Sequence, residues 1–368
     1  MDYVEILQSV GILSGIGGTL ALLMSVAKNT VGNYGECNIT VNDDKVLEVQ
    51  GGETLLSTLI DNGIFIPSAC GGKGTCGYCT AQVFEGGGEF LATEAPHITP
   101  KERENHVRLT CQVKVKRDMK IGIPEEYLSL RQYFTKVESI VDVTDKIKHL
   151  TLQLAPEDAM EFKAGQYVQI LAPEYENSDE EIYRAYSICS SPDVKDKLEL
   201  FIGYIPEGIA TTYVHFHLKE GDDLEIIGPF GHFFYQDTDK EMVMAAIGTG
   251  LAPIMSILRY MRNHKIHRKA RVFFSARHKA DLYMMEELLE IQKEIPEIEY
   301  YFSLTRPEES DNWDGLRGRV TDTIPQFIED ASNMEAYLCG NNAMIDAVIA
   351  TLKEKGMPEE SIFYDKFE

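Results

Sequence analysis

The chain has 368 residues, of which 44% are apolar and 26% charged, as in an ordinary globular protein. This length gives room for two or three domains that each bury a core of their own. A formal net charge of −24 disfavours nucleic acid as a partner, and seven cysteines in so long a chain exclude a small secreted disulfide scaffold.

A stretch without charged residues, Ile6 to Ala27, lies near the N-terminus. About 20 apolar residues suffice for a helix to cross a membrane. A cleaved signal peptide fits poorly, because the residues before the stretch include acids and no lysine or arginine. The first charge after it, Lys28, favours the cytoplasm for the rest of the chain. We therefore expect a single-pass transmembrane helix in residues 1–28 and a linker in residues 29–36.

The segment after the linker has the pattern of a small domain of strands and one helix. Two β-rich runs, residues 38–42 and 46–49, flank the turn residues Asp43 and Asp44 and predict a hairpin. Thr54 is placed to cap a helix whose leucines fall on one face.

Three cysteines, Cys70, Cys76 and Cys79, lie in one glycine-rich loop, and a strand expected at residues 109–115 brings a fourth, Cys111. Four thiolates on such a loop are what a [2Fe–2S] cluster requires. Structural zinc is the alternative, but zinc ribbons usually contain two Cys-x-x-Cys pairs and this chain has one.

The order of hairpin, helix, cysteine loop and closing strand predicts a β-grasp ferredoxin domain over residues 37–124. Five residues separate its first two cysteines, whereas the plant-type pattern has four. The longer gap indicates a distinct branch of the ferredoxin fold.

Residues 133–236 contain short β runs broken by Gly, Pro and Asp, which predict a small closed barrel. One of these runs contains Arg184, Tyr186 and Ser187. Alternate residues of a strand share a face, so Arg184 and Tyr186 project together. Such a strand suits FAD, with arginine for the phosphate, the tyrosine ring against the isoalloxazine and serine near its reactive N5 edge.

Two further segments of this predicted barrel are candidates for binding FAD. Gly208, Thr211 and Thr212 begin a predicted helix, whose N-terminal amides would bind the pyrophosphate. The alternative is a capped crossover helix without a ligand. Gly228 and Gly231 bracket a predicted tight turn at the barrel rim.

Residues 237–368 alternate apolar strands with helices, which predicts a doubly wound parallel sheet for NADH. Its first strand, residues 242–247, leads into Gly248 and Gly250 and then a helix, a geometry that suits a dinucleotide pyrophosphate. These glycines do not fit Gly-x-Gly-x-x-Gly, so a standard Rossmann dehydrogenase is disfavoured.

Ligands of such sheets bind at the carboxyl ends of the strands. Ser275 and Arg277 lie at one predicted strand end, where they would bind the adenosine ribose, although Arg277 could also contact the 2′-phosphate of NADPH. Cys339 and Gly340 lie at another, where nicotinamide would meet flavin. Cys339 could instead be a plain buried thiol.

In this order the motifs resemble those of the F subunits of sodium-translocating NADH:quinone reductases, over essentially the whole chain. The resemblance implies a multidomain α+β and α/β protein with a transmembrane helix, a [2Fe–2S] domain, a ferredoxin-reductase-like FAD barrel and an NADH domain. It also implies partner subunits in the cell membrane, and a terminal segment, Tyr364 to Phe367, in which Phe367 covers the flavin face.

The chain departs from this family in two places. Before the flavin strand it has only a short acidic loop, residues 174–181, where the family has a long insertion. It ends in Glu368 rather than in glycines. Both departures concern the partner complex and the final acceptor, not the reductase chemistry.

The motifs lead to the hypothesis that NADH reduces FAD by hydride transfer and that single electrons pass through the cluster to a membrane partner, with quinone as the expected acceptor. Tyr186, Ser187, Cys339 and Phe367 would be the residues at the hydride-transfer site. Two alternatives remain: a reductase component that feeds an oxygenase, and an anchored electron carrier without NADH turnover.

Overall fold

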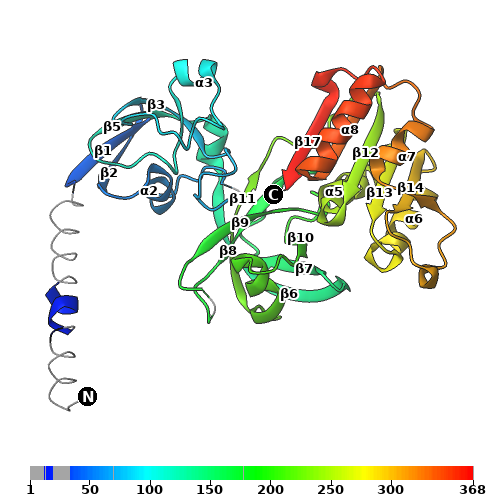
Figure 1. The fold of residues 1–368 in the computed structure, drawn as a ribbon, viewed down its shortest axis with the longest axis horizontal. Helices are drawn as coiled ribbons and strands as arrows, with labels where there is room; N and C mark the ends of the chain where they lie inside the picture. The colour runs from blue at the N-terminus through cyan, green and yellow to red at the C-terminus, as the bar shows by residue number, and fades with distance from the viewer. Residues whose placement is uncertain (1–11, 13, 20–33, 69, 177, 368) are drawn as a thin grey trace, which may run out of the picture. The chain divides into compact units, whose positions relative to one another are not determined.

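The computed structural model describes residues 12, 14–19, 34–68, 70–176 and 178–367. They belong to two compact units, Met1–Ser129 and Leu130–Glu368 (Figure 1). The predicted transmembrane segment and most of the linker lie outside the described residues, apart from Ile12 and residues 14–19, which are helical. Within the described part of the chain, every helix is too short or too polar to span a bilayer.

The first unit is built on a mixed five-stranded sheet of order β2-β1-β5-β3-β4. Its strands are β1 (Glu36–Val41), β2 (Lys45–Gln50), β3 (Thr80–Glu85), β4 (Val107–Leu109) and β5 (Met119–Gly122). The predicted hairpin is confirmed as β1 and β2, and the predicted helix as α2 (Leu55–Asp61), where the Thr54 hydroxyl accepts the Ser57 N–H at 3.1 Å. A short helix, α3 (Pro100–Glu104), precedes β4.

The strand predicted at residues 109–115 is wrong in its position. β4 ends at Leu109, and Cys111 follows in a turn. Thr110 N still continues the register of β3 and β4 by donating to Cys79 O at 2.7 Å, and the backbone then turns where Gln112 N donates to Leu109 O at 2.9 Å. The turn directs Cys111 toward the cysteine loop instead of along the sheet.

The second unit begins with an antiparallel six-stranded sheet of order β10-β7-β6-β11-β8-β9. Its strands are β6 (Arg131–Thr144), β7 (Ile147–Leu154), β8 (Tyr167–Ala172), β9 (Ile182–Ser187), β10 (Lys197–Gly203) and β11 (Asp223–Phe230). Leu150, Leu152, Ile170, Leu200 and Ile226 are fully buried inside its curve.

The prediction of a closed barrel is wrong, because the sheet is a half-barrel whose end strands meet at one bridge, Ile188 to Leu200. The carbonyls that follow β9 are bound elsewhere. Cys189 O accepts from Arg259 at 2.9 Å and Ser190 O accepts from Ser256 at 2.7 Å, both on helix α5 (Leu251–Asn263). The chain after β9 therefore joins the next layer instead of completing a ladder with β10.

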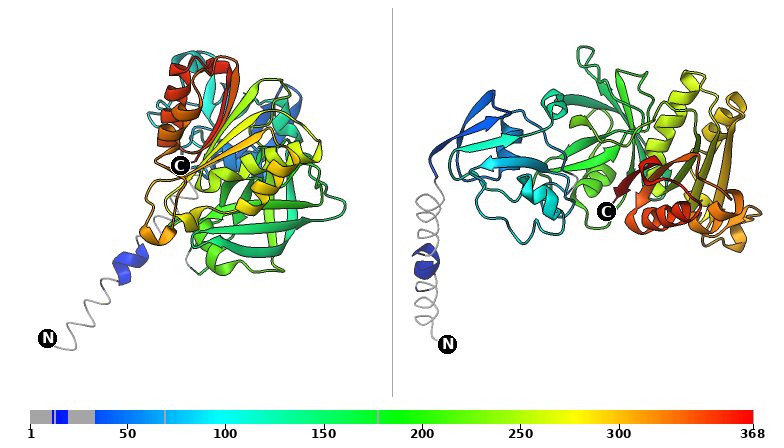
Figure 2. Two further views of the ribbon diagram at one scale, coloured as in Figure 1. Left: turned by 90° about the vertical axis from the view of Figure 1, so that its right-hand side faces the viewer. Right: turned by 90° about the horizontal axis from the view of Figure 1, so that it is seen from above.

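The remainder of this unit confirms the doubly wound parallel sheet, in the order β15-β14-β13-β12-β16-β17. Figure 2 shows this part of the chain in yellow-green to red. Its strands are β12 (Glu241–Ile247), β13 (Ala270–Ala276), β14 (Ile298–Leu304), β15 (Leu316–Arg317), β16 (Met334–Asn341) and β17 (Ile362–Phe367). Its other helices are α6 (Met285–Glu294), α7 (Val320–Phe327) and α8 (Asn342–Glu354). Alternate residues of β12 face opposite layers, since Met242 and Met244 join one core and Val243 and Ala245 the other.

Arg259 on α5 connects the half-barrel to the parallel sheet. Its guanidinium is nearly buried and hydrogen-bonds Glu199 of β10 and both carboxylate oxygens of Glu287 on α6, each of the latter at 2.7 Å. His149 Nε2 lies 3.3 Å from the Glu199 carboxylate. Burial alone would raise the pKa of Glu199, but His149 and Arg259 lower it to about 2.

We predict that Arg259→Leu destabilises the second unit by about 3–5 kcal/mol, because it leaves two partly buried carboxylates without their cation. The measurement is urea denaturation followed by the fluorescence of Trp313, the single tryptophan of the chain, which lies in this unit. Arg262→Leu is the matched control on the same helix. Arg262 is 3.9 Å from Glu287, so its loss should cost less than about 1 kcal/mol. Equal effects of the two substitutions would contradict the assignment.

The depressed pKa of Glu199 also predicts a pH dependence. The ionised Glu199 carboxylate contributes to the free energy of unfolding above the pKa of an unfolded glutamate, about 4.3. This contribution is lost as the pH falls toward 2. Glu199→Gln should therefore abolish a stability loss of the order of 2–3 kcal/mol between pH 5 and about 2. The check is the pH dependence of the unfolding free energy, with the exposed Glu138→Gln as control. If the unfolding free energy of Glu199→Gln falls as steeply below pH 5 as that of the unaltered protein, the prediction is wrong.

Candidate functional site

The four predicted cysteines converge in the first unit as two pairs. Cys76 Sγ lies 3.4 Å from Cys70 Sγ, and Cys79 and Cys111 are hydrogen-bonded through their side chains. Two sulfurs on one tetrahedral metal with bonds of about 2.3 Å lie roughly 3.7 Å apart. The donor set therefore fits a two-iron cluster, with Cys70 and Cys76 on one iron and Cys79 and Cys111 on the other.

Hydrogen bonding within each pair sets the pKa values of these thiols. The pKa of Cys70 is lowered to about 3, chiefly because the Cys76 thiol donates to it, and the pKa of Cys76 is raised for the reciprocal reason. In the second pair Cys79 donates to Cys111, which lowers the pKa of Cys111 to about 7 and raises that of Cys79. Four thiolates this close together require a positively charged core such as iron.

Two glycines of the loop are required where other side chains lie against it. Gly74 and Gly77 both have φ +75°, a region that favours glycine. A Cβ on Gly74 would lie 2.6 Å from Gln112 Nε2, and one on Gly77 would lie 2.9 Å from His97 Nδ1. A side chain at either position would therefore obstruct the loop.

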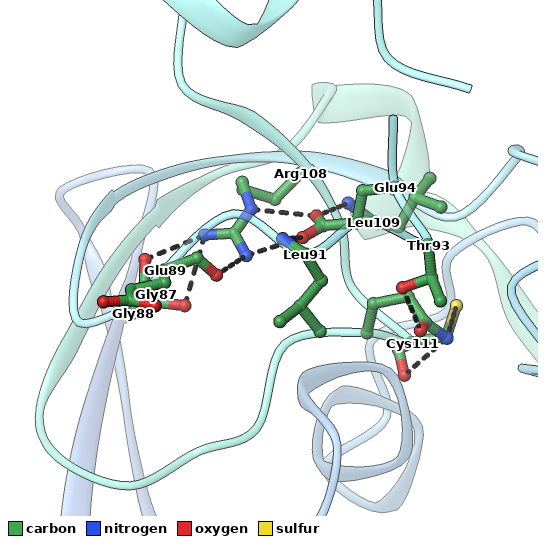
Figure 3. Close-up of polar contacts among 10 residues, drawn as sticks. Gly87, Gly88, Glu89, Leu91, Thr93, Glu94, Arg108, Leu109 and Cys111 are labelled. Carbon is green, nitrogen blue, oxygen red and sulfur yellow. Dashed lines mark hydrogen bonds and ion pairs between the residues drawn. The ribbon is translucent and has the colours of Figure 1, made fainter. Parts of the chain in front are cut away.

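A buried ion pair, missed by sequence reasoning, supports the segment that carries Cys111 (Figure 3). Arg108 of β4 donates Nε to Glu94 Oε1 at 2.8 Å and Nη2 to Glu94 Oε2 at 2.7 Å. It also donates to the carbonyls of Gly87, Gly88 and Glu89. Burial would raise the pKa of Glu94, but the hydrogen bonds from Arg108 and two backbone amides keep it below its usual value. The alternating pattern around Arg108 marks a strand residue but does not name its partner.

In the second unit, the predicted flavin strand is β9. Arg184 and Tyr186 are partly exposed, and burial of the Tyr186 hydroxyl raises its pKa. Ser187 is 4% exposed, and its Oγ is buried without a hydrogen-bond partner among the described residues. A buried hydroxyl without a partner costs about 1–3 kcal/mol, so Ser187 has a donor to offer a bound group such as flavin.

The predicted phosphate-binding helix begins as expected, with Gly208 as the N-cap of α4 (Ile209–Thr212), and continues as one π-helical turn, Tyr213–His217. The two threonines differ. Thr211 Oγ1 is buried and hydrogen-bonds the backbone of Ile205 and Gly208, so it stabilises the loop. Thr212 is partly exposed, so it is the more accessible of the two threonines.

The tight turn predicted between Gly228 and Gly231 is wrong. Strand β11 continues through Phe230, with a register shift between Ile227 and Phe230. The Phe230 ring stacks on Tyr167 with centroids 5.5 Å apart, which holds the segment in the sheet. Gly231, at φ +100°, follows it, and a Cβ there would lie 3.0 Å from the Tyr167 ring.

Residues Gly248 to Gly250, which follow β12, form the predicted dinucleotide-binding loop, here called the nucleotide loop. This loop and the end of β16 meet at the switch point of the parallel sheet, where strand order reverses between β12 and β16. A Cβ on Gly250 would lie 2.2 Å from Cys339 O, and a Cβ on Gly340 would lie 2.6 Å from Met344 Cε. Gly248 has φ +52° and open space beside it. The structure therefore brings Gly250 directly against Cys339 and Gly340.

Cys339 is fully buried, and burial raises the pKa of its thiol. Asp365 stands opposite it in β17, where burial raises the pKa of the carboxyl to about 7. The side chain of Phe367, predicted to cover the flavin, lies outside the described residues.

At the predicted ribose end, Ser275 and Arg277 differ in accessibility. The Ser275 hydroxyl is buried and hydrogen-bonds the hydroxyl of Ser303 on the next strand. Arg277 is exposed at the carboxyl end of β13. Of this pair, only Arg277 is accessible from the surface.

Tyr283 is a second residue that sequence reasoning missed. Its hydroxyl donates to Gly248 O at 2.9 Å, and its ring lies edge-on to Phe201 of β10 with centroids 5.0 Å apart. It thereby fixes the nucleotide loop against the half-barrel. Its partners lie about 35 and 80 residues away in sequence, so no local pattern indicates them.

Three domain families match the chain in the predicted order. Residues 39–116 match the 2Fe-2S iron-sulfur cluster binding domain, residues 135–235 the oxidoreductase FAD-binding domain and residues 244–349 the oxidoreductase NAD-binding domain. The three predicted cofactors are confirmed at this level.

The chain is 34% identical to the F subunit of the Na(+)-translocating NADH-quinone reductase of Pseudomonas aeruginosa, over 99% of this chain and 98% of the relative. It is 35% identical to the F subunit of the same reductase of Idiomarina loihiensis, over 99% of both chains. The chain belongs to this F-subunit family. The resemblance found in the motifs is thus confirmed over the full length.

Solved structures show how widely the fold of these F subunits is shared. The cytochrome P450 reductase GcoB of Amycolatopsis aligns with a TM-score of 0.74 and 27% identity, over 90% of this chain and 98% of that one. A ferredoxin reductase in carbazole 1,9a-dioxygenase aligns with a TM-score of 0.70 and 22% identity, over 91% and 99%. The latter likeness concerns the fold alone.

The close approach of Gly250 to β16 leads to a prediction for Gly250→Ala. The added methyl would collide with the backbone carbonyl of Cys339, which cannot rotate away, so the nucleotide loop must shift. We expect the nicotinamide dinucleotide to bind at least tenfold more weakly, while the FAD content stays the same. Titration of the oxidised protein with NAD⁺, with flavin absorbance as a check on folding, measures both. Unaltered nucleotide affinity would show that the loop does not bind the dinucleotide.

Proposed function

We propose that the chain transfers electrons from NADH, through FAD and a [2Fe–2S] cluster, to a quinone-reducing partner in the membrane, as the F subunit of a sodium-translocating NADH:quinone reductase. The observation that carries the proposal is the pairing of four cysteine sulfurs in a chain whose second unit contains FAD- and NAD-binding domains. The names of the full-length relatives support the complex and its acceptor.

The cofactors supply the redox chemistry, because NADH gives two electrons together, the cluster accepts one, and a flavin can exchange either number. The residues of this chain bind and orient. The Ser187 hydroxyl on β9 has no hydrogen-bond partner among the described residues, Tyr186 offers a ring on the same strand, and Arg184 offers a cation for phosphate. Hydride transfer requires no side chain as general acid or base, so none is assigned.

The surroundings of Arg277 support NADH over NADPH. His278 follows Arg277 directly in the chain. Its Nδ1 lies 3.8 Å from a carboxylate oxygen of Glu308 and 4.0 Å from one of Asp311. Lys279 is engaged with Asp311 through its backbone N–H and its ammonium. Acidic groups so close to the strand end would repel a 2′-phosphate and leave the ribose hydroxyls of NADH as the favoured ligand.

The proposed location is the cell membrane, with a single-pass anchor in residues 1–28 and the two units in the cytoplasm. The uncharged stretch from Ile6 to Ala27 and the first following charge at Lys28 support this orientation. Membrane subunits of the same complex are the proposed partners.

A second candidate function is a reductase that feeds an oxygenase, and the 27% identity to GcoB, itself named a cytochrome P450 reductase, favours it. The uncharged N-terminal stretch argues against it. Purification of the native membrane fraction, followed by assays of NADH oxidation with quinone and with a soluble oxygenase partner, distinguishes the two. Recovery of the full-length chain only in the soluble fraction would exclude the quinone-reductase role.

The proposed electron order predicts opposite defects for two substitutions. Cys70→Ala should spare the bleaching of flavin absorbance by NADH but abolish electron transfer to quinone, because it removes one ligand of the cluster. Ser187→Ala should slow flavin reduction about 10- to 100-fold and leave the cluster signal in electron paramagnetic resonance unchanged, because it removes one positioned donor. Anaerobic stopped-flow reduction by NADH measures the first step.

Cys37→Ala is the matched control for Cys70→Ala, because Cys37 is a buried cysteine of the same unit in strand β1 and is not one of the four paired thiols. It should keep both steps. Loss of NADH-to-flavin transfer in Cys70→Ala with FAD still bound would show that the proposed order is wrong.

A further inference from the structure

The side chain of Gln112 turns back toward the sulfur of the cysteine that precedes it. Its Nε2 lies 3.5 Å from Cys111 Sγ and 3.5 Å from Cys111 O. Its Oε1 accepts the Thr93 hydroxyl at 2.9 Å (Figure 3). Because Thr93 occupies the amide oxygen, the amide nitrogen is the end that faces the sulfur. A thiolate ligand therefore has a side-chain N–H donor beside it.

The same amide is also confined by the cysteine loop. A Cβ on Gly74 would lie 2.6 Å from Gln112 Nε2 and 2.9 Å from Cδ, so the amide rests directly against the glycine backbone between Cys70 and Cys76. The glycine leaves the room that the amide occupies. Gln112 thus contacts the loop that holds two of the thiols and the sulfur of a third.

Both ends of the Thr93–Gln112 hydrogen bond are anchored by the buried ion pair. Glu94, next to Thr93, is fully buried, and its carboxylate accepts the backbone N–H of Leu91 at 2.9 Å and that of Leu109 at 3.1 Å. Arg108 donates two further hydrogen bonds to the same carboxylate. Since Leu109 leads into Cys111 and Gln112, one carboxylate fixes both backbone segments that the hydrogen bond joins.

We propose that Gln112 is a positioning residue that raises the reduction potential of the cluster by donating its amide N–H to Cys111 Sγ, and that Thr93 holds the amide in that orientation. Reduction adds negative charge to the cluster and its thiolates, so a donor to sulfur stabilises the reduced form more than the oxidised one. This inference rests on the proposed function only in that the four cysteines hold a [2Fe–2S] cluster.

The test is the midpoint potential of the cluster in the full chain, titrated anaerobically and followed by electron paramagnetic resonance. Gln112→Leu should lower the equilibrium constant for cluster reduction about tenfold, which is ~59 mV for a one-electron couple. Thr93→Val should shift it in the same direction by a smaller amount, because the amide loses its orientation but not its donor. Gln112→Glu should shift it further than Gln112→Leu, because a carboxylate repels the reduced cluster.

Gln82→Leu is the matched control. It makes the same substitution in the same unit, where the Gln82 amide donates to a backbone carbonyl, Asn105 O, at 3.1 Å and not to a sulfur. Its midpoint potential should equal that of the unaltered protein. The rate of flavin reduction by NADH should stay the same in all four variants.

An unchanged midpoint potential in Gln112→Leu, with the cluster present, would overturn the inference. Loss of the cluster in Gln112→Leu, Gln112→Glu and Thr93→Val alike would also overturn it, since Gln112 would then serve assembly and not potential. The inference rests only on the [2Fe–2S] cluster of the proposed function, and failure of that part is distinguishable, because the unaltered protein would then show no [2Fe–2S] signal at all.

Discussion

Buried positive charge is the constraint on which both units depend. The chain carries a net charge of −24, yet Arg108, Arg259 and Arg268 are each less than a tenth exposed. Each is stable there because carboxylates and carbonyls complete its hydrogen bonds, and Arg268 pairs with Glu335 at 2.7 Å. A guanidinium binds several acceptors in fixed directions, so one arginine can hold several backbone segments in register. The interior of this acidic protein is organised by its few buried cations.

Two of these arginines lie beside the segments that would hold cofactors. Arg108 fixes residues 87–94 to the turn that presents Cys111, and Arg259 fixes the end of β9, just after Ser187, to the helix that follows the nucleotide loop. His149, Cys189 and Glu199 place possible ligand atoms within 4.8 Å of one another, as a metal site would. The Arg259 guanidinium already binds that carboxylate, so the position of a cation is occupied by the protein itself.

The parts that could be predicted from the sequence have local causes. The spacing of the cysteines was enough to predict the cluster ligands, and the apolar strand before Gly248 was enough to predict the parallel sheet. The parts that were missed or wrong depend on partners far apart in the chain. The half-barrel remains open because Arg259 and Ser256 bind carbonyls that precede them by about 70 residues. The roles of Glu94 and Tyr283 were not predicted, because each depends on burial and on a hydrogen bond to a residue outside its own segment, not on a motif.

Hydrogen-bond satisfaction separates the hydroxyls that motif reasoning treated alike. Ser187, Thr211 and Ser275 are all nearly buried. Thr211 and Ser275 have protein partners, so a ligand that used either hydroxyl would have to break an existing bond. Ser187 has none among the described residues, and a bound group would relieve a cost that the fold otherwise carries. The energy of an unsatisfied donor thus favours Ser187, of these three hydroxyls, as the one we propose to contact FAD, while the two satisfied hydroxyls stabilise their own segments.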